Sequence, residues 1–175
     1  KSRNTSIKCR KFFKVSRTAN RTFGYILFFN FLRSNKLSCF NWMFLLKIYI
    51  FCFSFYIDFF AYRKYGMSLT GLTYRALPYG PVPERWDRIY GCFDEIALEP
   101  RIVGDKEGLL VVPVGKPDSA LLSAEELEVI TFICSRFMNC SAADISLISH
   151  KEDAWLDCHS DRRRIPYDYA FRLQA

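Results

Sequence analysis

The segment from Pro78 to Pro83 (PYGPVP) constrains the fold of this 175-residue chain more than any other stretch. Its three prolines fix the backbone angle φ and remove three N–H donors, so neither a helix nor a central sheet strand can pass through it. The segment therefore predicts a rigid corner. Residues 72–77 come before it and alternate well enough to predict a short strand. We expect Gly80, Pro81 and Pro83 to be structural residues that hold this strand and the next element at a fixed angle.

The charge of the chain separates two unlike parts. Residues 1–57 contain eleven Lys and Arg and no acid, whereas residues 58–175 contain fourteen basic and eighteen acidic residues. The formal charge of +7 is therefore the sum of +11 and −4. Because the basic isoelectric point belongs to the N-terminal third, it gives no argument for nucleic-acid binding by the rest of the chain. A nucleic-acid partner stays open only if the basic arm takes part.

Residues 1–54 form an atypical basic and apolar segment, and residues 55–175 form the predicted domain. The run Cys39–Ile57 has about the length of a membrane span, although Lys47 near its middle would cost about 2.5 to 3.5 kcal/mol there. Three interpretations stay open for this segment: a non-native or frame-disturbed lead-in, a buried or membrane-lying helix, and a true span. A membrane partner through residues 39–57 is allowed but not favoured.

The remaining pattern predicts a mostly helical α+β domain with a short antiparallel sheet. A helix over 55–65 should end at Gly66, and a second helix over 84–96 carries Trp86 on its apolar face. A hairpin follows at about 97–114, with its second strand at a sheet edge or ending at Pro113. This hairpin and the strand at about 72–77 make up the predicted sheet.

Three helix starts are predicted in the C-terminal third. Ser123 with Glu126 forms a capping box, Ser141 with Asp144 starts a shorter helix, and Ser149 with Glu152 forms a second box just before Trp155. Residues 165–166 should be extended, and residues 167–173 predict a last short helix. Arg162–Arg164 is a basic run that predicts either a solvated turn or a contact with an acidic protein or a nucleic-acid backbone.

The residues give little support to catalysis or metal binding. Ser149, His150 and Asp153 are neighbours in sequence, but adjacent side chains at a helix start diverge, so they do not predict a nucleophile and its base. The seven cysteines include no CxxC pair, and with their odd number and wide spacing they fit reduced thiols in a cytosol. No phosphate-binding glycine loop is present. We expect no enzyme activity, no catalytic residues, no metal and no cofactor.

Four short motifs, in order, resemble the Panacea domain, the SocA-like antitoxin domain of bacterial and phage toxin–antitoxin systems. The resemblance covers roughly residues 56–174. The motifs are Thr70-Gly71-Leu72 with Tyr74, Tyr79-Gly80-Pro81-Val82-Pro83, Ser149-His150 with Glu152 and Trp155, and Ile165-Pro166-Tyr167 with Ala170. The departure lies upstream of Phe55, where the sequence does not resemble the family's helix, and this suggests a truncated or frame-disrupted member. Some members carry a DNA-binding module before the domain.

The resemblance implies a cytoplasmic prokaryotic or phage-associated protein that neutralises a cognate toxin by direct binding. It also allows an adaptor role, with a protease such as a Clp-type machine as a second partner. The alternative is a membrane-anchored or DNA-linked regulatory protein with the same domain. Residues expected at the partner interface are Tyr74, Tyr79, Trp86, His150, Trp155 and Tyr167, although Trp86 and Trp155 also suit core positions. Residues expected to shape the motifs are Gly71, Gly80, Pro81, Pro83, Ser149 and Glu152.

Overall fold

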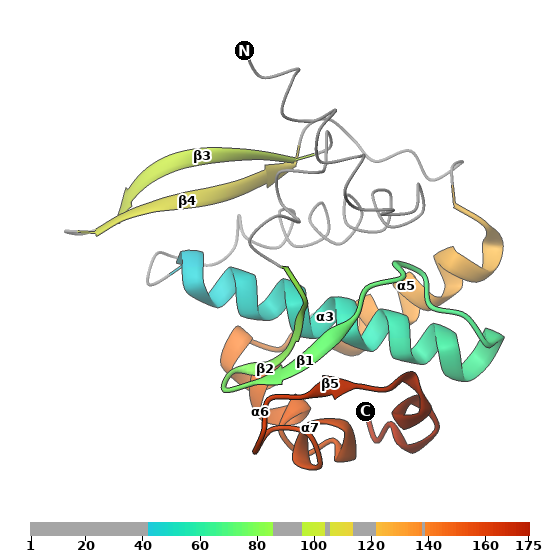
Figure 1. Cartoon of the computed structure of the whole chain (residues 1–175). Coiled ribbons are helices and arrows are strands. Elements are labelled where there is room, and N and C mark those ends of the chain that lie inside the picture. Colours follow the sequence, from blue (N-terminus) through green and yellow to red (C-terminus); the bar gives the residue numbers. More distant parts are fainter. Residues whose placement is uncertain (1–41, 86–95, 104–105, 114–121, 138) are drawn as a thin grey trace.

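The computed structural model describes residues 42–85, 96–103, 106–113, 122–137 and 139–175 (Figure 1). The architecture is α+β, as predicted, with one long helix running through the middle of the described part (Figure 1). The elements in chain order are α3 (Trp42–Tyr65), β1 (Tyr74–Leu77), β2 (Gly80–Pro83), β3 (Ile96–Val103), β4 (Lys106–Pro113), α5 (Ala124–Phe137), α6 (Ala142–Ser149), α7 (Asp153–Leu156), β5 (Arg164–Ile165) and the 3-10 helix η3 (Tyr167–Arg172).

Helix α3 is the core of the domain. Every side chain from Ile50 to Phe59 is at most 3% exposed, because α5, α6, β2 and η3 all contact this helix. A helix that is apolar on all faces is stable only when it is buried on all faces. The predicted start near residue 55 is therefore wrong: the helix begins at Trp42 and crosses position 54 without a break. In the described part of the chain, no helix combines the length and the hydropathy of a membrane span.

The predicted end of this helix is confirmed. Arg63 and Lys64 lie in its last turn, and the N–H of Gly66 donates to the carbonyl of Tyr62 at 2.9 Å. Gly66 has φ of 73°, the left-handed conformation that favours glycine at this position.

The proline-rich segment forms a β-hairpin rather than a bare corner. Strand β1 pairs with β2 from Tyr74↔Pro83 to Leu77↔Gly80, so Pro78 and Tyr79 form the turn. The strand order is β2-β1-β5, which places the prolines on an edge strand. Proline is tolerated there because its missing N–H removes no bond from a central ladder. The sequence excluded a central strand correctly, but it did not predict that the segment folds back on residues 74–77.

A second, separate sheet consists of β3 and β4. Their register runs from Ile96↔Pro113 to Val103↔Lys106, which confirms the predicted hairpin and its end at Pro113. Strand β4 begins at Lys106, earlier than predicted, and the strand at 74–77 does not join this sheet. Most of the predicted helix over 84–96, including Trp86, falls on residues 86–95, which lie outside the described residues. Ile96 belongs to β3 instead of a helix.

Two of the three predicted helix starts are confirmed. The Ser123 N–H donates to the Glu126 carboxylate at 2.8 Å, and the Glu126 N–H donates to the Ser123 hydroxyl at 3.2 Å. Ser141 and Asp144 make the same reciprocal pair at the start of α6, at 2.8 and 3.1 Å. These bonds satisfy N–H groups that the first turn of a helix leaves unpaired.

Candidate protein-binding surface

A buried carboxylate on α3 joins two of the sequence motifs. Asp58 is fully buried, and its Oδ1 accepts from the N–H of Thr70 at 2.7 Å. Its Oδ2 accepts from the Thr70 hydroxyl, from the Tyr74 hydroxyl at 2.7 Å and from the Tyr167 hydroxyl at 3.4 Å. Tyr167 also donates to the carbonyl of Leu72 at 2.6 Å. Asp58 therefore fixes the start of β1 and the start of η3 against the central helix.

Burial raises the pKa of Asp58 to about 6, and the hydrogen bonds from Thr70, Tyr74 and Tyr167 oppose that rise. In the described part of the chain no basic side chain contacts this carboxylate, so hydrogen bonds alone compensate its charge. A buried charge of this kind is retained only where its donors are held in place. The cluster is therefore a rigid support beneath the hairpin.

Gly80 lets the hairpin sit directly on α3 and α6. Its φ is +125°, and a Cβ built there would lie 2.7 Å from the Cys52 sulfur and 2.8 Å from the Ser149 hydroxyl oxygen. The Tyr79 carbonyl accepts from the Ser146 hydroxyl at 2.9 Å. The Cys52 thiol lies 3.9 Å from the same carbonyl oxygen. The turn of the hairpin is thus bound to both helices.

The predicted capping box at Ser149 is wrong. Ser149 is the last residue of α6, and its hydroxyl donates back to the carbonyl of Ser146 at 2.7 Å. The residue that precedes α7 is Glu152, whose side chain makes no cap bond. The reason is that the Glu152 carboxylate is buried and accepts elsewhere, from the N–H groups of Gln174 at 2.8 Å and Ala175 at 3.1 Å.

Glu152 instead anchors the C-terminal residues to the core. Besides the two backbone donors, its Oε1 accepts from the hydroxyl of Tyr56 on α3 at 3.3 Å. Burial raises the pKa of Glu152, and the N–H groups of Gln174 and Ala175 oppose that rise. The Glu152 carboxylate therefore links α3, the start of α7 and the residues after η3.

Trp155 lies between two histidines and against the hairpin. The His150 ring stacks on it with ring centres 4.0 Å apart, and the His159 ring stacks on it at 4.2 Å. The indole N–H donates to the carbonyl of Leu77, the last residue of β1, at 2.9 Å. Burial, and then the nearby His159, lower the pKa of His150. The stacked rings and the indole hydrogen bond therefore hold α7 against the hairpin.

The same elements expose large apolar side chains. Tyr79 in the hairpin turn is 54% exposed, Leu147 on α6 is 61% exposed and Leu156 on α7 is 48% exposed. The bonds from Ser146 and Trp155 to the hairpin bring these three elements together. We call this region the hairpin–helix surface: Tyr79, Leu147, His150, Trp155 and Leu156.

The predicted interface residues divide into two groups. His150 stacks on Trp155, whose indole donates to the carbonyl of Leu77 in the hairpin, and Tyr79 is exposed in the turn of the same hairpin, so these three belong to the hairpin–helix surface. Tyr74 is fully buried and Tyr167 is half-buried against Phe59, so both serve the Asp58 cluster, and a partner of this folded state cannot contact Tyr74. Trp86 lies outside the described residues. The interface role of these residues stays a prediction.

Sequence reasoning missed three residues of this region. No sequence pattern singled out Leu147 or Leu156, and Asp58 was noted only as a charge toward the end of an apolar run. One signal for Asp58 was available: it is the first acid after eleven basic residues, and it stands inside a run of aromatic residues. A single acid in such a place indicates a buried carboxylate with donors near it.

The family of the chain follows from its motifs and from a family model. The model for the antitoxin SocA-like Panacea domain matches residues 54–156, more than half of the chain. The chain belongs to this Panacea family. The match contains the Thr70–Tyr74, Tyr79–Pro83 and Ser149–Trp155 motifs, which confirms the predicted resemblance over these residues; the Ile165–Ala170 motif lies outside the match. The antitoxin-like domain implies a toxin as its partner in general. No curated protein and no solved structure matched the chain.

The described part of this Panacea domain holds no group of three side chains placed to bind a metal ion. Cys52 and Cys134 are buried, and burial raises the pKa of each thiol to about 12. Both are therefore protonated at neutral pH and behave as small apolar core residues.

Proposed function

We propose that this protein is an antitoxin that neutralises its cognate toxin by binding it directly through the hairpin–helix surface. The observation that carries the proposal is that two family motifs, Tyr79–Pro83 and Ser149–Trp155, contact one another at Gly80 and Ser149. Tyr79 in the first motif and Leu147 and Leu156, which flank the second, are exposed there. Exposed aromatic and aliphatic side chains on a rigid support are typical of the centre of a protein interface.

The rigidity of the support adds to the argument. The hairpin turn is held by bonds to Cys52 and Ser146, and Trp155 is fixed by two stacked rings and one hydrogen bond. A surface that is already ordered loses little conformational entropy when its partner binds. Tyr79 and Leu147 are therefore placed to contribute binding energy without prior rearrangement.

We also propose that the protein acts by binding and not by catalysis. The Ser149 hydroxyl donates to Ser146 and faces Cys52, while the His150 ring stacks on Trp155. No hydrogen bond joins Ser149 to His150 among the described residues, so the pair lacks the contact that an activated nucleophile needs.

The test is co-expression of the full chain with the toxin encoded by an adjacent gene, with cell growth as the measurement. The wild-type chain should restore growth, and the double variant Tyr79→Ala/Leu147→Ala should fail to do so. Met67→Ala is the matched control, because Met67 is 67% exposed and lies in the loop after α3, away from this surface. Full rescue by the double variant would refute the proposed surface.

The fate of the toxin in the cell distinguishes an adaptor role from direct neutralisation. If the domain delivers the toxin to a protease such as a Clp-type machine, toxin levels should fall on co-expression and recover in cells that lack the protease. Direct neutralisation predicts that the toxin persists in a complex and that rescue does not need the protease. We propose the second outcome.

A further inference from the structure

The outward face of the three-stranded sheet gathers positive charge. Burial alternates along β1, so Tyr74 and Ala76 face the core and Arg75 faces outward. Arg75 lies directly opposite Val82 on β2 and opposite Arg164 on β5. Two like charges directly opposite one another on a sheet are destabilising unless an anion lies between them.

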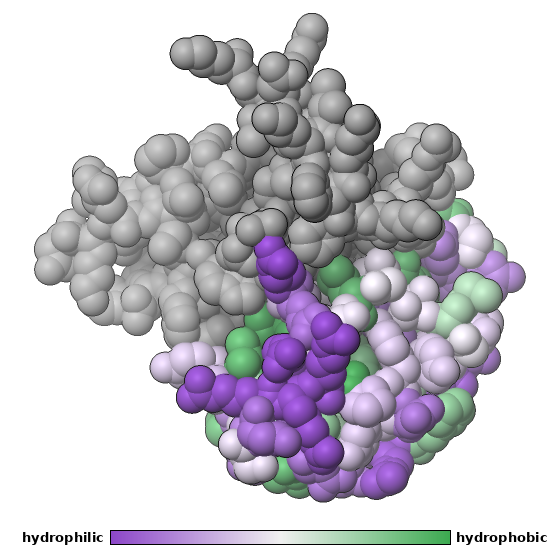
Figure 2. All heavy atoms as spheres, in the orientation of Figure 1, coloured by the Kyte–Doolittle hydropathy of each residue, from purple (hydrophilic) through white to green (hydrophobic). Residues whose placement is uncertain are grey.

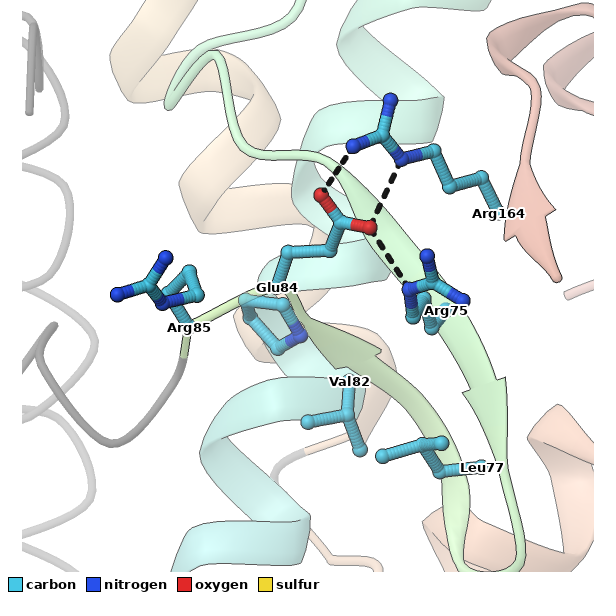
Figure 3. A pocket seen from close by; sticks show the side chains of 7 residues that line it. Arg75, Leu77, Val82, Glu84, Arg85 and Arg164 are labelled. Atoms are coloured by element: carbon cyan, nitrogen blue, oxygen red, sulfur yellow. Dashed lines mark hydrogen bonds and ion pairs between the residues drawn. The ribbon is translucent and has the colours of Figure 1, made fainter. Parts of the chain in front are cut away.

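Glu84, just after β2, supplies that anion (Figure 3). The Arg164 guanidinium donates two bonds to its carboxylate, at 2.8 and 2.9 Å, and the Arg75 Nε donates a third at 2.7 Å. The bond from Arg164, and then the bond from Arg75, lower the pKa of Glu84. The Glu84 carboxylate thus fixes the orientation of the Arg75 and Arg164 guanidiniums. Its single negative charge balances only one of their two positive charges.

Three further arginines are neighbours of this arrangement in the chain, Arg85 after Glu84 and Arg162 and Arg163 before Arg164, and Arg75 donates to the carbonyl of Arg162 at 3.0 Å. We call the five residues the arginine face: Arg75, Arg85, Arg162, Arg163 and Arg164. Arg85 and Arg162 have positive φ, 58° and 53°, and neither side chain has an ion-pair partner among the described residues. The carboxylates that pair with the face there are Glu84 and Asp161. Five positive charges against two negative charges leave a net charge of +3. Backbone strain at a charged surface residue is typical of binding sites.

The face is also hollowed. A cavity of about 470 Å³ is lined by Arg75, Leu77, Val82, Pro83, Glu84, Arg85 and Arg164. Figure 3 shows Glu84 between Arg75 and Arg164, with Arg85 on its other side and with Val82 and Leu77 below. Figure 2 shows a continuous hydrophilic band over this part of the molecule. The cavity therefore combines an apolar floor with cations at its rim.

We propose that the arginine face binds an acidic segment of the protein partner. The carboxylates of that segment would pair with Arg85, which lines the cavity, and with Arg162, whose carbonyl accepts from Arg75. Its apolar side chains would cover Leu77 and Val82. A protein segment fits better than a nucleic acid, because the lining residues that the structure describes include no aromatic ring for base stacking and Glu84 opposes a run of phosphates. This inference rests on the proposed function, since it specifies the chemistry of the same partner.

The test uses the full chain and two fluorescent probes of equal net charge, a peptide of alternating Glu and Leu and a single-stranded DNA. Fluorescence anisotropy at low salt gives the affinity for each. The double variant Arg85→Glu/Arg162→Gly removes the unpaired cations without touching the Glu84 bonds, and glycine at 162 suits the positive φ. Arg136→Ala is the matched control, an exposed arginine in the last turn of α5.

We expect the double variant to bind the peptide at least tenfold more weakly than wild type, with the control within twofold. Equal peptide binding by wild type and double variant would overturn the proposal, and would assign any peptide binding to the basic residues before α3. A tenfold loss seen only with the DNA would overturn it in favour of a nucleic-acid site. Growth rescue by the wild-type chain reports the proposed function separately, so the two can fail independently.

Discussion

Replacing Gly80 is the substitution that tests the architecture most sharply. A Cβ at this position would lie 2.7 Å from the Cys52 sulfur and 2.8 Å from the Ser149 hydroxyl oxygen, and both side chains are buried. Overpacking of this kind costs about 1 to 3 kcal/mol, and a non-glycine residue at strained φ costs about 1 to 2 kcal/mol more. We therefore expect Gly80→Ala to lower the free energy of unfolding by about 2 to 5 kcal/mol.

The control is Gly71→Ala. Gly71 also has a positive φ, 72°, but a Cβ there meets no atom within 4 Å. Its substitution should cost only the backbone strain, about 1 to 2 kcal/mol. Chemical denaturation of the full chain measures both values.

The clash itself is tested in the background Cys52→Ala/Ser149→Ala, which removes the two atoms that the new Cβ would meet. In that background the cost of Gly80→Ala should fall by about 1 kcal/mol or more, because only strain remains. Two results would refute the reasoning: a Gly80→Ala cost no larger than that of Gly71→Ala, or a cost that is unchanged when Cys52 and Ser149 are truncated.

Three further predictions follow from the buried polar groups. The pKa of Asp58 is about 6 in the folded protein against an ordinary value of 3.8, so between these pH values the folded protein holds a proton that the unfolded chain has lost. The stability of wild type relative to Asp58→Asn should therefore fall as pH rises from about 4 to about 6. Denaturation at each pH measures this trend, and a rise in relative stability would contradict the assignment. Trp155→Phe removes the bond to the Leu77 carbonyl and should cost about 1 to 2 kcal/mol, whereas an unchanged denaturation midpoint would show that the bond contributes nothing. Glu152→Gln should speed hydrogen exchange at the Gln174 and Ala175 amides, and exchange at the wild-type rate would refute the anchoring role.

Short sequence patterns predicted the helix and strand ends that depend on neighbouring residues. The Ser123 and Ser141 boxes, the glycine stop at Gly66 and the end of β4 at Pro113 depend on residues within a few positions of one another. The side chain and the backbone group that it satisfies are both visible in such a short stretch. These predictions are confirmed.

The start of α3 could not be predicted from periodicity. Residues 50–59 are buried on every face, so they show no amphipathic alternation and resemble a membrane span in composition. The tertiary structure supplies the distinction, since α5, α6, β2 and η3 surround the helix. A helix of this kind becomes recognisable only once its neighbours are known.

The Ser149 box failed for a related reason. A serine followed three residues later by glutamate has the spacing of a cap, but Glu152 is used by Tyr56 and by the last two residues of the chain. Tyr56 lies 96 residues before Glu152, and the Gln174 and Ala175 amides lie 22 and 23 residues after it, beyond η3. Long-range hydrogen bonds compete with local ones, and here they win because the carboxylate is buried.

Part of the hairpin–helix surface could be predicted from the sequence. Tyr79, His150 and Trp155 stand in the family motifs, and the structure stacks His150 on Trp155 and bonds Trp155 to the hairpin that carries Tyr79. Tyr74 belongs to the same motifs but faces the core, because alternate residues of β1 point to opposite faces of the sheet. Motif membership thus identifies the region, and the register of β1 decides which side chains a partner can reach.

The most direct test of the central claim is the dissociation constant of the full chain for the toxin encoded by the adjacent gene, measured by isothermal titration calorimetry. We expect a stable complex with wild type and with Met67→Ala. We expect affinity to fall by at least about 30-fold, or about 2 kcal/mol, for Tyr79→Ala/Leu147→Ala, because interface residues at the centre of a contact contribute at this level. Binding of equal strength by the double variant and wild type would contradict the claim that the hairpin–helix surface recognises the toxin.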